Sequence, residues 1–387
     1  MTATATKRSE VVLNKELEEF YAKCWHAAKE SLERLGIDAN ALDRIKDPKE
    51  SIKIWRGAVD PNTTKELLGL MGKANKAFAK EHNLPEKTVN DKRLVDFFST
   101  YMKTFGKDVN VSITKVTGTM TDGVNHIIFR EGNLVLESFV GIAHEMAHLD
   151  TPFAKKLAEV QAMSSLMIKS PKTRGEADVV DYYVQLTGAP KDLVSNAFEI
   201  QITAHKSFDT SIFLIDLYEM GVYKPADKRI RENLEFSRFY SDPKMRRAFH
   251  RYVEGQAICA EAAAVDSSDD AVRAYGAMQF ILNMTFLTPR FVAIFGGETA
   301  ARDARKSEGF RDYYTIREDI GEGNLKKLDK ACAEKDFVPG IDINGRLVVI
   351  DTKKLKMHEV DVEKLKAGIT NIEELIGKAP KLPEKMG

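Results

Sequence analysis

The chain has few cysteines, no excess charge of either sign and no long uninterrupted hydrophobic run. Three cysteines in 387 residues are odd in number and widely spaced, at Cys24, Cys259 and Cys332. This spacing argues against a disulfide framework or a cysteine zinc site and favours buried thiols in a reducing compartment. The 58 basic and 58 acidic residues balance, so no net field attracts nucleic acid or an anionic membrane.

Two further features concern membranes and export. Residues 1–10 are polar and lack the apolar segment of a secretory signal. The most apolar stretch, Ala277 to Phe295, is interrupted by polar residues and a proline, which favours buried helices over a membrane span. We therefore expect a cytoplasmic protein with neither a nucleic-acid nor a membrane partner.

What the chain does contain is one chemically specific string, His144-Glu145-Met146-Ala147-His148, within an apolar segment of helical periodicity. Two histidines four residues apart project from the same face of a helix, one turn apart, and can bind one zinc ion. Glu145 points to the side, where it can accept a proton from a zinc-bound water. The string predicts a hydrolytic zinc site with His144 and His148 as ligands and Glu145 as the general base.

Other roles for the string are structural histidines bonded to backbone carbonyls, or half of a di-iron site. The pair Glu145 and His148 has the Glu-x-x-His spacing of helical di-iron proteins. Such proteins need a second copy of that pair on another helix, and the sequence contains none.

The pattern along the chain predicts an α+β, predominantly α-helical protein. Helical periodicity covers residues 13–35, where Gly36 is a plausible stop, and also residues 63–81 and 92–105. Helices also dominate residues 151–266 and 271–295. We expect a helical N-terminal region at 1–106, a peptidase domain with a helical insertion at 107–300, and a C-terminal region at 301–387.

Strand patterns occur in two places. Residues 109–117 alternate apolar and polar side chains, and residues 124–130 form a second strand just before the motif helix. We expect a small antiparallel sheet in which the second strand is either an exposed edge that adds a substrate peptide or an ordinary core strand. Residues 338–350 predict a hairpin around Asn344-Gly345.

Two histidines do not complete a catalytic zinc site, which has three protein ligands. No third histidine or aspartate follows His148 at short spacing, so a glutamate on a later helix is expected. Glu254 and Glu261 are seven apart in a mostly small and apolar segment, where an unpaired carboxylate is costly and a metal removes that cost. Small residues between them would allow close approach to the motif helix. Glu176 is a further candidate.

These residues carry a resemblance to gluzincin peptidases. The run from Glu254 to Glu261 looks like the Glu-x-x-Ala-x-x-x-Glu helix of the Mlc titration factor and anthrax lethal factor peptidases, whose first glutamate binds zinc. The motif helix is also similar to that of the former. The resemblance implies a zincin-like core with Glu254 as third ligand, and the 105 residues between His148 and Glu254 imply an inserted helical segment. By contrast, Glu176-Ala177-Asp178 is similar to the Glu-Ala-Asp helix of HtpX-like peptidases, but Arg174 stands at that family's ligand position.

The function expected is zinc-dependent hydrolysis of a polypeptide substrate. A donor to the developing oxyanion would be one of four residues: Tyr252, His250, His205 or His126. Glu261 or Asp266 would accept a hydrogen bond from a ligating histidine and orient it. The alternative is a structural or interaction protein that keeps the metal on a peptidase scaffold without activity. The sequence does not indicate the oligomeric state.

Overall fold

The computed structural model describes residues 13–53, 61–116, 119–121, 125–154, 176–205, 217–218, 220–221, 223–224, 228–285 and 298–376. The chain forms two compact units. The first comprises Met1–Asp150, His250–Leu325 and Ile341–Arg346, and the second Thr151–Phe249, Lys326–Gly340 and Leu347–Gly387. The segment Thr151–Phe249, which lies between the two predicted site helices in the chain, belongs to the second unit.

The described elements make the protein predominantly helical with two small sheets, an α+β fold. In chain order they begin with α1 (Lys15–Arg34), η1 (Asn40–Ile45), α2 (Pro48–Lys53), α3 (Pro61–Glu81), α4 (Lys92–Lys103), β1 (Asn110–Thr114), β2 (Met120–Thr121), β3 (His126–Arg130) and α5 (Val135–Asp150). They continue with α7 (Glu176–Thr187), α8 (Lys191–His205), α10 (Lys228–Ser241), α11 (Pro243–Ala260), η4 (Glu261–Asp266), α12 (Asp270–Thr285) and α14 (Glu298–Ile320). The last elements are α15 (Glu322–Glu334), β4 (Phe337–Ile341), β5 (Leu347–Asp351), β6 (Lys356–Glu359), α16 (Val362–Lys366) and α17 (Ile372–Leu375).

Local signals explain where the first helices begin and end. The side chain of Asn14 caps α1 by accepting a hydrogen bond from the backbone N–H of Leu17 at 3.0 Å. Gly36 follows with φ +70°, the left-handed conformation that ends helices, which confirms the predicted stop. The helices expected over 13–35, 63–81 and 92–105 are confirmed as α1, α3 and α4.

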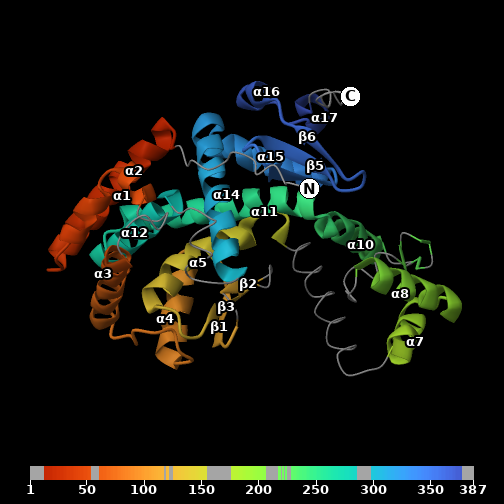
Figure 1. Ribbon diagram of the computed structural model, residues 1–387, viewed down its shortest axis with the longest axis horizontal. Coiled ribbons are helices and arrows are strands. Elements are labelled where there is room, and N and C mark those ends of the chain that lie inside the picture. Colours follow the sequence, from red (N-terminus) through yellow and green to blue (C-terminus); the bar gives the residue numbers. More distant parts are fainter. Residues whose placement is uncertain are drawn as a thin grey trace. The chain divides into compact units, whose positions relative to one another are not determined.

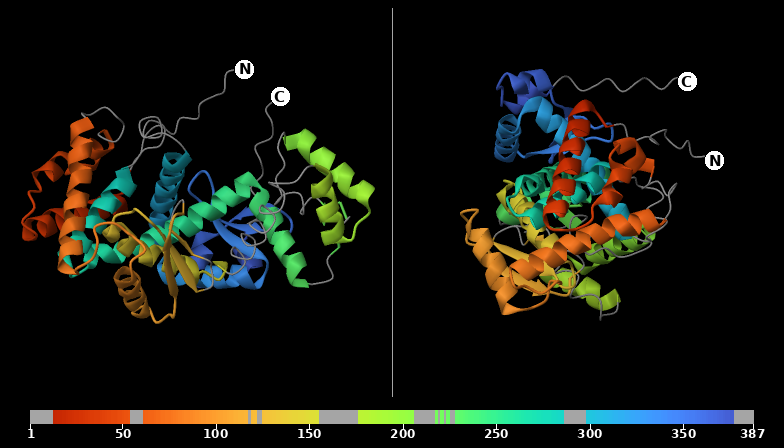
Figure 2. Two further views of the ribbon diagram at one scale, coloured as in Figure 1. Left: turned by 90° about the horizontal axis from the view of Figure 1, so that it is seen from below. Right: turned by 90° about the vertical axis from the view of Figure 1, so that its left-hand side faces the viewer.

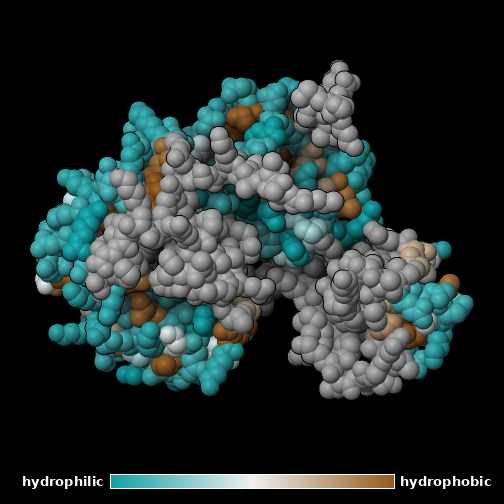
Figure 3. Space-filling view, in the orientation of Figure 1, coloured by the Kyte–Doolittle hydropathy of each residue, from teal (hydrophilic) through white to brown (hydrophobic). Residues whose placement is uncertain are grey.

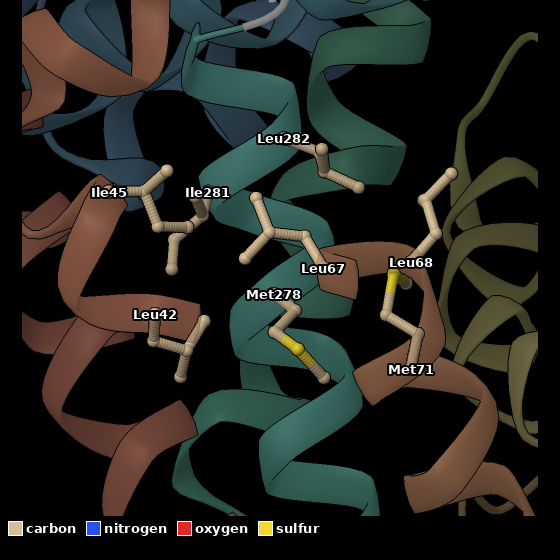
Figure 4. A pocket seen from close by; sticks show the side chains of 8 residues that line it. All are labelled: Leu42, Ile45, Leu67, Leu68, Met71, Met278, Ile281 and Leu282. Carbon is tan, nitrogen blue, oxygen red and sulfur yellow. The ribbon is translucent and has the colours of Figure 1, made fainter. Parts of the chain in front are cut away.

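Helix α12 is the centre of the first unit. It lies alongside α1 and also contacts α3, α5, α14 and η4 (Figures 1 and 2). Phe280 of α12 packs on Phe20 of α1 and Phe310 of α14, each with a ring-centroid distance of 5.3 Å. On another face, Met278 and Ile281 meet aliphatic side chains of η1 and α3 around a small apolar pocket (Figure 4). The site described below is therefore built against a continuous hydrophobic core.

The first sheet differs from the predicted one. Its strand order is β1-β3-β2, with β1 parallel to β3, Asn110 opposite His126, and β2 antiparallel to β3. The expectation of a purely antiparallel sheet is wrong. The strand before the motif helix, β3, is central, so the edge-strand interpretation is also wrong and the core-strand alternative is confirmed. Among the described strands, β1 and β2 are the edges of this sheet, and β2 runs antiparallel to β3.

The second unit has its own core and sheet. Residues of α7, α8 and α10 pack together, including Tyr183, Phe198 and Leu234. The second sheet has the order β4-β5-β6. Between β4 and β5 the chain turns as predicted, with Gly345 at φ +78° and its N–H donating to the carbonyl oxygen of Asp342 at 3.1 Å. Strand β6 and helices α14 and α15 are further elements that the sequence patterns did not predict.

Hydrophobic residues on the visible described surface form small separate patches among hydrophilic ones (Figure 3). Large exposed hydrophobic side chains occur singly, for example Leu68, Phe105 and Met120. Within the described ranges, none of the helices combines the length and the apolar character needed to cross a bilayer.

Candidate metal centre

Helix α5 presents the two motif histidines side by side. Their rings lie 4.8 Å apart between centroids at an interplanar angle of 80°, and their Nε2 atoms are 3.1 Å apart. His144 is 8% exposed and Glu145 is 7% exposed, whereas His148 is partly buried. The motif therefore sits at the inner face of the helix, with His148 at its more open end.

Helix α11 brings a third possible ligand to the same point. The carboxylate of Glu254 places Oε2 3.5 Å from His144 Nε2 and Oε1 4.0 Å from His148 Nε2. One ligand atom from each of the three residues lies within 4.8 Å of the others. This group could hold a metal ion, and it consists of the three residues predicted as ligands.

The distances among the three residues test whether zinc fits between them. In a tetrahedral site with bonds of about 2.0–2.1 Å, ligand atoms are separated from one another by about 3.3 Å. The 3.1 Å between the two Nε2 atoms and the 3.5 Å from Glu254 Oε2 to His144 Nε2 are close to edges of such a tetrahedron, whereas the 4.0 Å to His148 is measured from the other carboxylate oxygen, Oε1. Two imidazoles and one carboxylate are also the donor set of catalytic zinc sites that keep a position for water. The donor set therefore fits zinc, and two of its separations match a tetrahedral site.

Glu261 lies on the other side of the His144 ring. Its Oε1 is 2.8 Å from His144 Nδ1, and the residue is 5% exposed. A carboxylate beside Nδ1 favours the tautomer with the proton on that nitrogen, which leaves the lone pair of Nε2 directed at the metal position. The two glutamates thus face different nitrogens of one ring. Glu254 faces the ligating nitrogen, and Glu261 lies where an orienting carboxylate is expected.

Asp266, the other predicted orienting residue, has a different role. Its carboxylate is exposed and pairs with Lys23 of α1 at 2.8 Å. The ion pair lies on the surface, so Asp266 is not the acceptor for His144.

Close helix packing positions the two glutamates. A Cβ atom on Gly255, next to Glu254, would lie 2.5 Å from both the carbonyl oxygen of Gly309 and the Cβ of Tyr313 on α14. A Cβ on Gly276 of α12 would lie 2.6 Å from the Cβ of Ala264 in η4. Of the small residues between the two glutamates, Gly255 allows close approach to α14, whereas we expected approach to the motif helix. The contact between Gly276 and Ala264 brings α12 close to η4.

The charged groups gathered here are acidic. Glu145, Glu254 and Glu261 are each buried or partly buried. Burial, with added repulsion from Glu137 and Glu261, raises the pKa of Tyr275 well above its ordinary value, so this phenol stays neutral. Three carboxylates and two imidazoles gathered at one point favour binding of a divalent cation.

Glu176, the alternative third ligand, begins α7 in the second unit. Its side chain lies outside the described part of the structure. The geometry that can be described therefore concerns Glu254 and Glu261.

The four predicted oxyanion donors are dispersed. His126 on β3 lies 2.9 Å from the hydroxyl of Ser112 through its Nε2. Tyr252 is 1% exposed and its ring packs on Tyr313 of α14, 5.1 Å between centroids. His250 lies four residues before Glu254 on α11, hence on the same face of that helix. His205 ends α8, and its side chain is not described.

One residue beside the centre was not predicted as part of the site, and its only signal is a polar side chain in an apolar run. Gln279 of α12 donates from Nε2 to Glu261 Oε2 at 2.5 Å. It belongs to an apolar helix and follows Glu261 by eighteen residues, and no motif marks it.

No protein-family model, curated protein or solved structure matches this chain.

Proposed function

We propose that the chain is a zinc-dependent metallopeptidase of the gluzincin type, with a zincin-like core. The observation that supports it is the convergence of His144, His148 and Glu254 at separations that suit one tetrahedral ion. Glu145, the residue after the first ligand, is buried on the same helix.

Zinc bound there would act as a Lewis acid and lower the pKa of a coordinated water toward neutrality. Glu145 accepts the proton of the attacking water and delivers it to the leaving amine. Glu261 keeps the proton of His144 on Nδ1, so that Nε2 stays available as a ligand. We favour His250 among the predicted oxyanion donors, because it lies one turn before Glu254 on the same face of α11.

The sheet supports a polypeptide as substrate. Strand β2 is an edge among the described strands, runs antiparallel to β3 and contacts α5. An extended peptide can pair with such an edge through backbone hydrogen bonds. The edge expected at β3 is therefore reassigned to β2.

The first test of this proposal is metal content. The purified full chain should contain about one equivalent of zinc, and Glu254→Ala should lose most of it, because two imidazoles alone leave the site incomplete. Glu137→Gln, which changes an exposed glutamate on the same helix as the motif, is the matched control and should keep the metal. A metal-free parent protein after reconstitution would refute the proposal.

The second test separates a peptidase from an inactive scaffold. Glu145→Gln keeps the shape of the side chain but removes the base, so zinc should stay bound while cleavage of a peptide library falls by at least about a hundredfold. Equal cleavage by parent and variant would show that Glu145 is not the base. A zinc-loaded parent that cleaves no library peptide would favour the interaction protein without activity.

A further inference from the structure

Gln279 lies behind the metal centre, two contacts away from the metal position. Its amide nitrogen donates to Oε2 of Glu261 at 2.5 Å, and Oε1 of the same carboxylate is 2.8 Å from His144 Nδ1. We propose that Gln279 is a positioning residue, which sets the orientation of His144 through Glu261. The inference rests on the proposed function, because it assigns a task to Gln279 only if His144 is a ligand.

The contacts show why this carboxylate needs a second partner. Glu261 is 5% exposed, so its charge is largely removed from water, and a buried carboxylate is costly unless its oxygens accept hydrogen bonds. The Glu261 carboxylate can also rotate about the bond that joins it to the rest of its side chain. A donor on each oxygen stops that rotation and keeps Oε1 facing the imidazole.

An amide suits this position better than a cation. A lysine or arginine would offset the negative charge of Glu261, and the attraction between that charge and the proton on His144 Nδ1 would weaken. The Gln279 amide donates a hydrogen bond without adding charge. The carboxylate therefore stays available to orient the imidazole.

The helix that carries Gln279 is held close to Glu261. Gly276 lies three residues earlier on α12 and leaves room for Ala264 of η4, whose Cβ would be 2.6 Å from an added Cβ. Residues three apart share a helix face. The contact between Gly276 and Ala264 therefore also sets the distance between Gln279 and Glu261.

The test measures metal affinity in the full chain, by competition of zinc with a chromophoric chelator. Gln279→Met keeps an unbranched side chain of similar length but lacks the donor, and we expect zinc affinity to fall about tenfold, the lower end for residues that support a ligand. The visible spectrum of the cobalt-substituted protein should also change, because it reports the geometry of the ligands. Gln279→Ala, which removes the donor by truncation, should weaken zinc binding similarly and serves if the methionine variant does not fold.

Asn283→Leu is the matched control. Asn283 lies one turn further along α12 and accepts a hydrogen bond from Ser307 at 3.2 Å, away from Glu261. Its replacement also removes an amide from this helix, so stability should fall while zinc affinity and the cobalt spectrum stay at parent values. This control separates a loss of orientation from a general loosening of α12.

A double-mutant cycle shows whether Gln279 acts through Glu261. Once Glu261→Gln has removed the carboxylate, Gln279→Met should cause no further loss of zinc affinity. Parent-like zinc affinity in both Gln279 variants, or losses that add fully to that of Glu261→Gln, would overturn the inference. A parent chain that binds no zinc would instead refute the proposed function.

Discussion

Replacing Gly255 with alanine should disturb the metal centre without touching any of its ligands. Gly255 directly follows Glu254 on α11 and faces α14. An added Cβ would lie 2.5 Å from the carbonyl oxygen of Gly309 and 2.5 Å from the Cβ of Tyr313. One obstacle is a backbone oxygen and the other is a Cβ atom, so no flexible side chain can move aside to accommodate the added Cβ.

The size of the effect follows from these distances. Carbon atoms in favourable contact are about 3.5–4.0 Å apart, so the two helices must separate by roughly 1 Å. Overpacking of this kind costs about 1–3 kcal/mol, and the better helix propensity of alanine offsets up to about 1 kcal/mol. We therefore expect a net destabilisation of up to about 2 kcal/mol. Because metal–ligand distances tolerate only about 0.2 Å, the displacement of Glu254 should lower zinc affinity on the order of tenfold.

The assay combines thermal unfolding of the metal-free chain with zinc competition. Gly141→Ala is the matched control, since Gly141 lies on α5 three residues before His144 and a Cβ there meets nothing within 4 Å. That variant should keep parent zinc affinity and gain up to about 1 kcal/mol of stability. Parent-like stability and affinity in Gly255→Ala would refute the idea that the contact with α14 positions Glu254.

Three other predictions concern the surroundings of the centre. Burial raises the pKa of the Cys259 thiol to about 12, and the other two cysteines are likewise buried, so a thiol reagent at pH 8 should modify none in the native protein and three after unfolding. Asp312→Ala leaves Glu308, at 3.8 Å, as the remaining acidic partner among the described residues of the Arg251 guanidinium, which is 8% exposed. The substitution should lower the free energy of unfolding by about 2 kcal/mol in chemical denaturation. Burial acts to raise the pKa of Asp342, but hydrogen bonds from Arg346 and Asn344 outweigh it and lower that pKa below its ordinary value of 3.8. The ionised carboxylate therefore stabilises the fold at pH values above 3.8, and this stabilisation is lost as the pH falls through the lower pKa of the folded state. Asp342→Asn should thus cost about 1 kcal/mol at pH 7 and little at pH 2, and equal losses at both pH values would contradict this reasoning.

Sequence reasoning succeeded where the signal is local. The cap at Asn14, the left-handed Gly36 and the hydrophobic period between them determine α1 within its own residues. The motif helix and the turn at Gly345 are equally local, because periodicity and turn chemistry involve only near neighbours.

The missed elements depend on distant parts of the chain. Helix α14 packs on several sides, with Gly309 against α11 and Phe310 against α12, so it has no single hydrophobic stripe to mark it. Strand β2 has two residues and exists through its pairing with β3. The order of the sheet, which makes β3 central, is also a non-local property that alternation within one strand does not contain.

The identity of the third ligand also depends on packing that the sequence pattern does not contain. Glu254 and Glu261 are seven residues apart, about 10 Å along a helix axis and on one face, so the pattern alone gives them equal access to the motif. The structure distinguishes them because the His144 ring lies between them, with Nε2 toward Glu254 and Nδ1 toward Glu261. The two nitrogens of an imidazole point in divergent directions, so one carboxylate can share a metal with the ring while the other holds its proton. Spacing identifies which glutamates reach the centre. The division of roles between them follows from the direction of α5, which depends on the packing of α5 against α3 and α12.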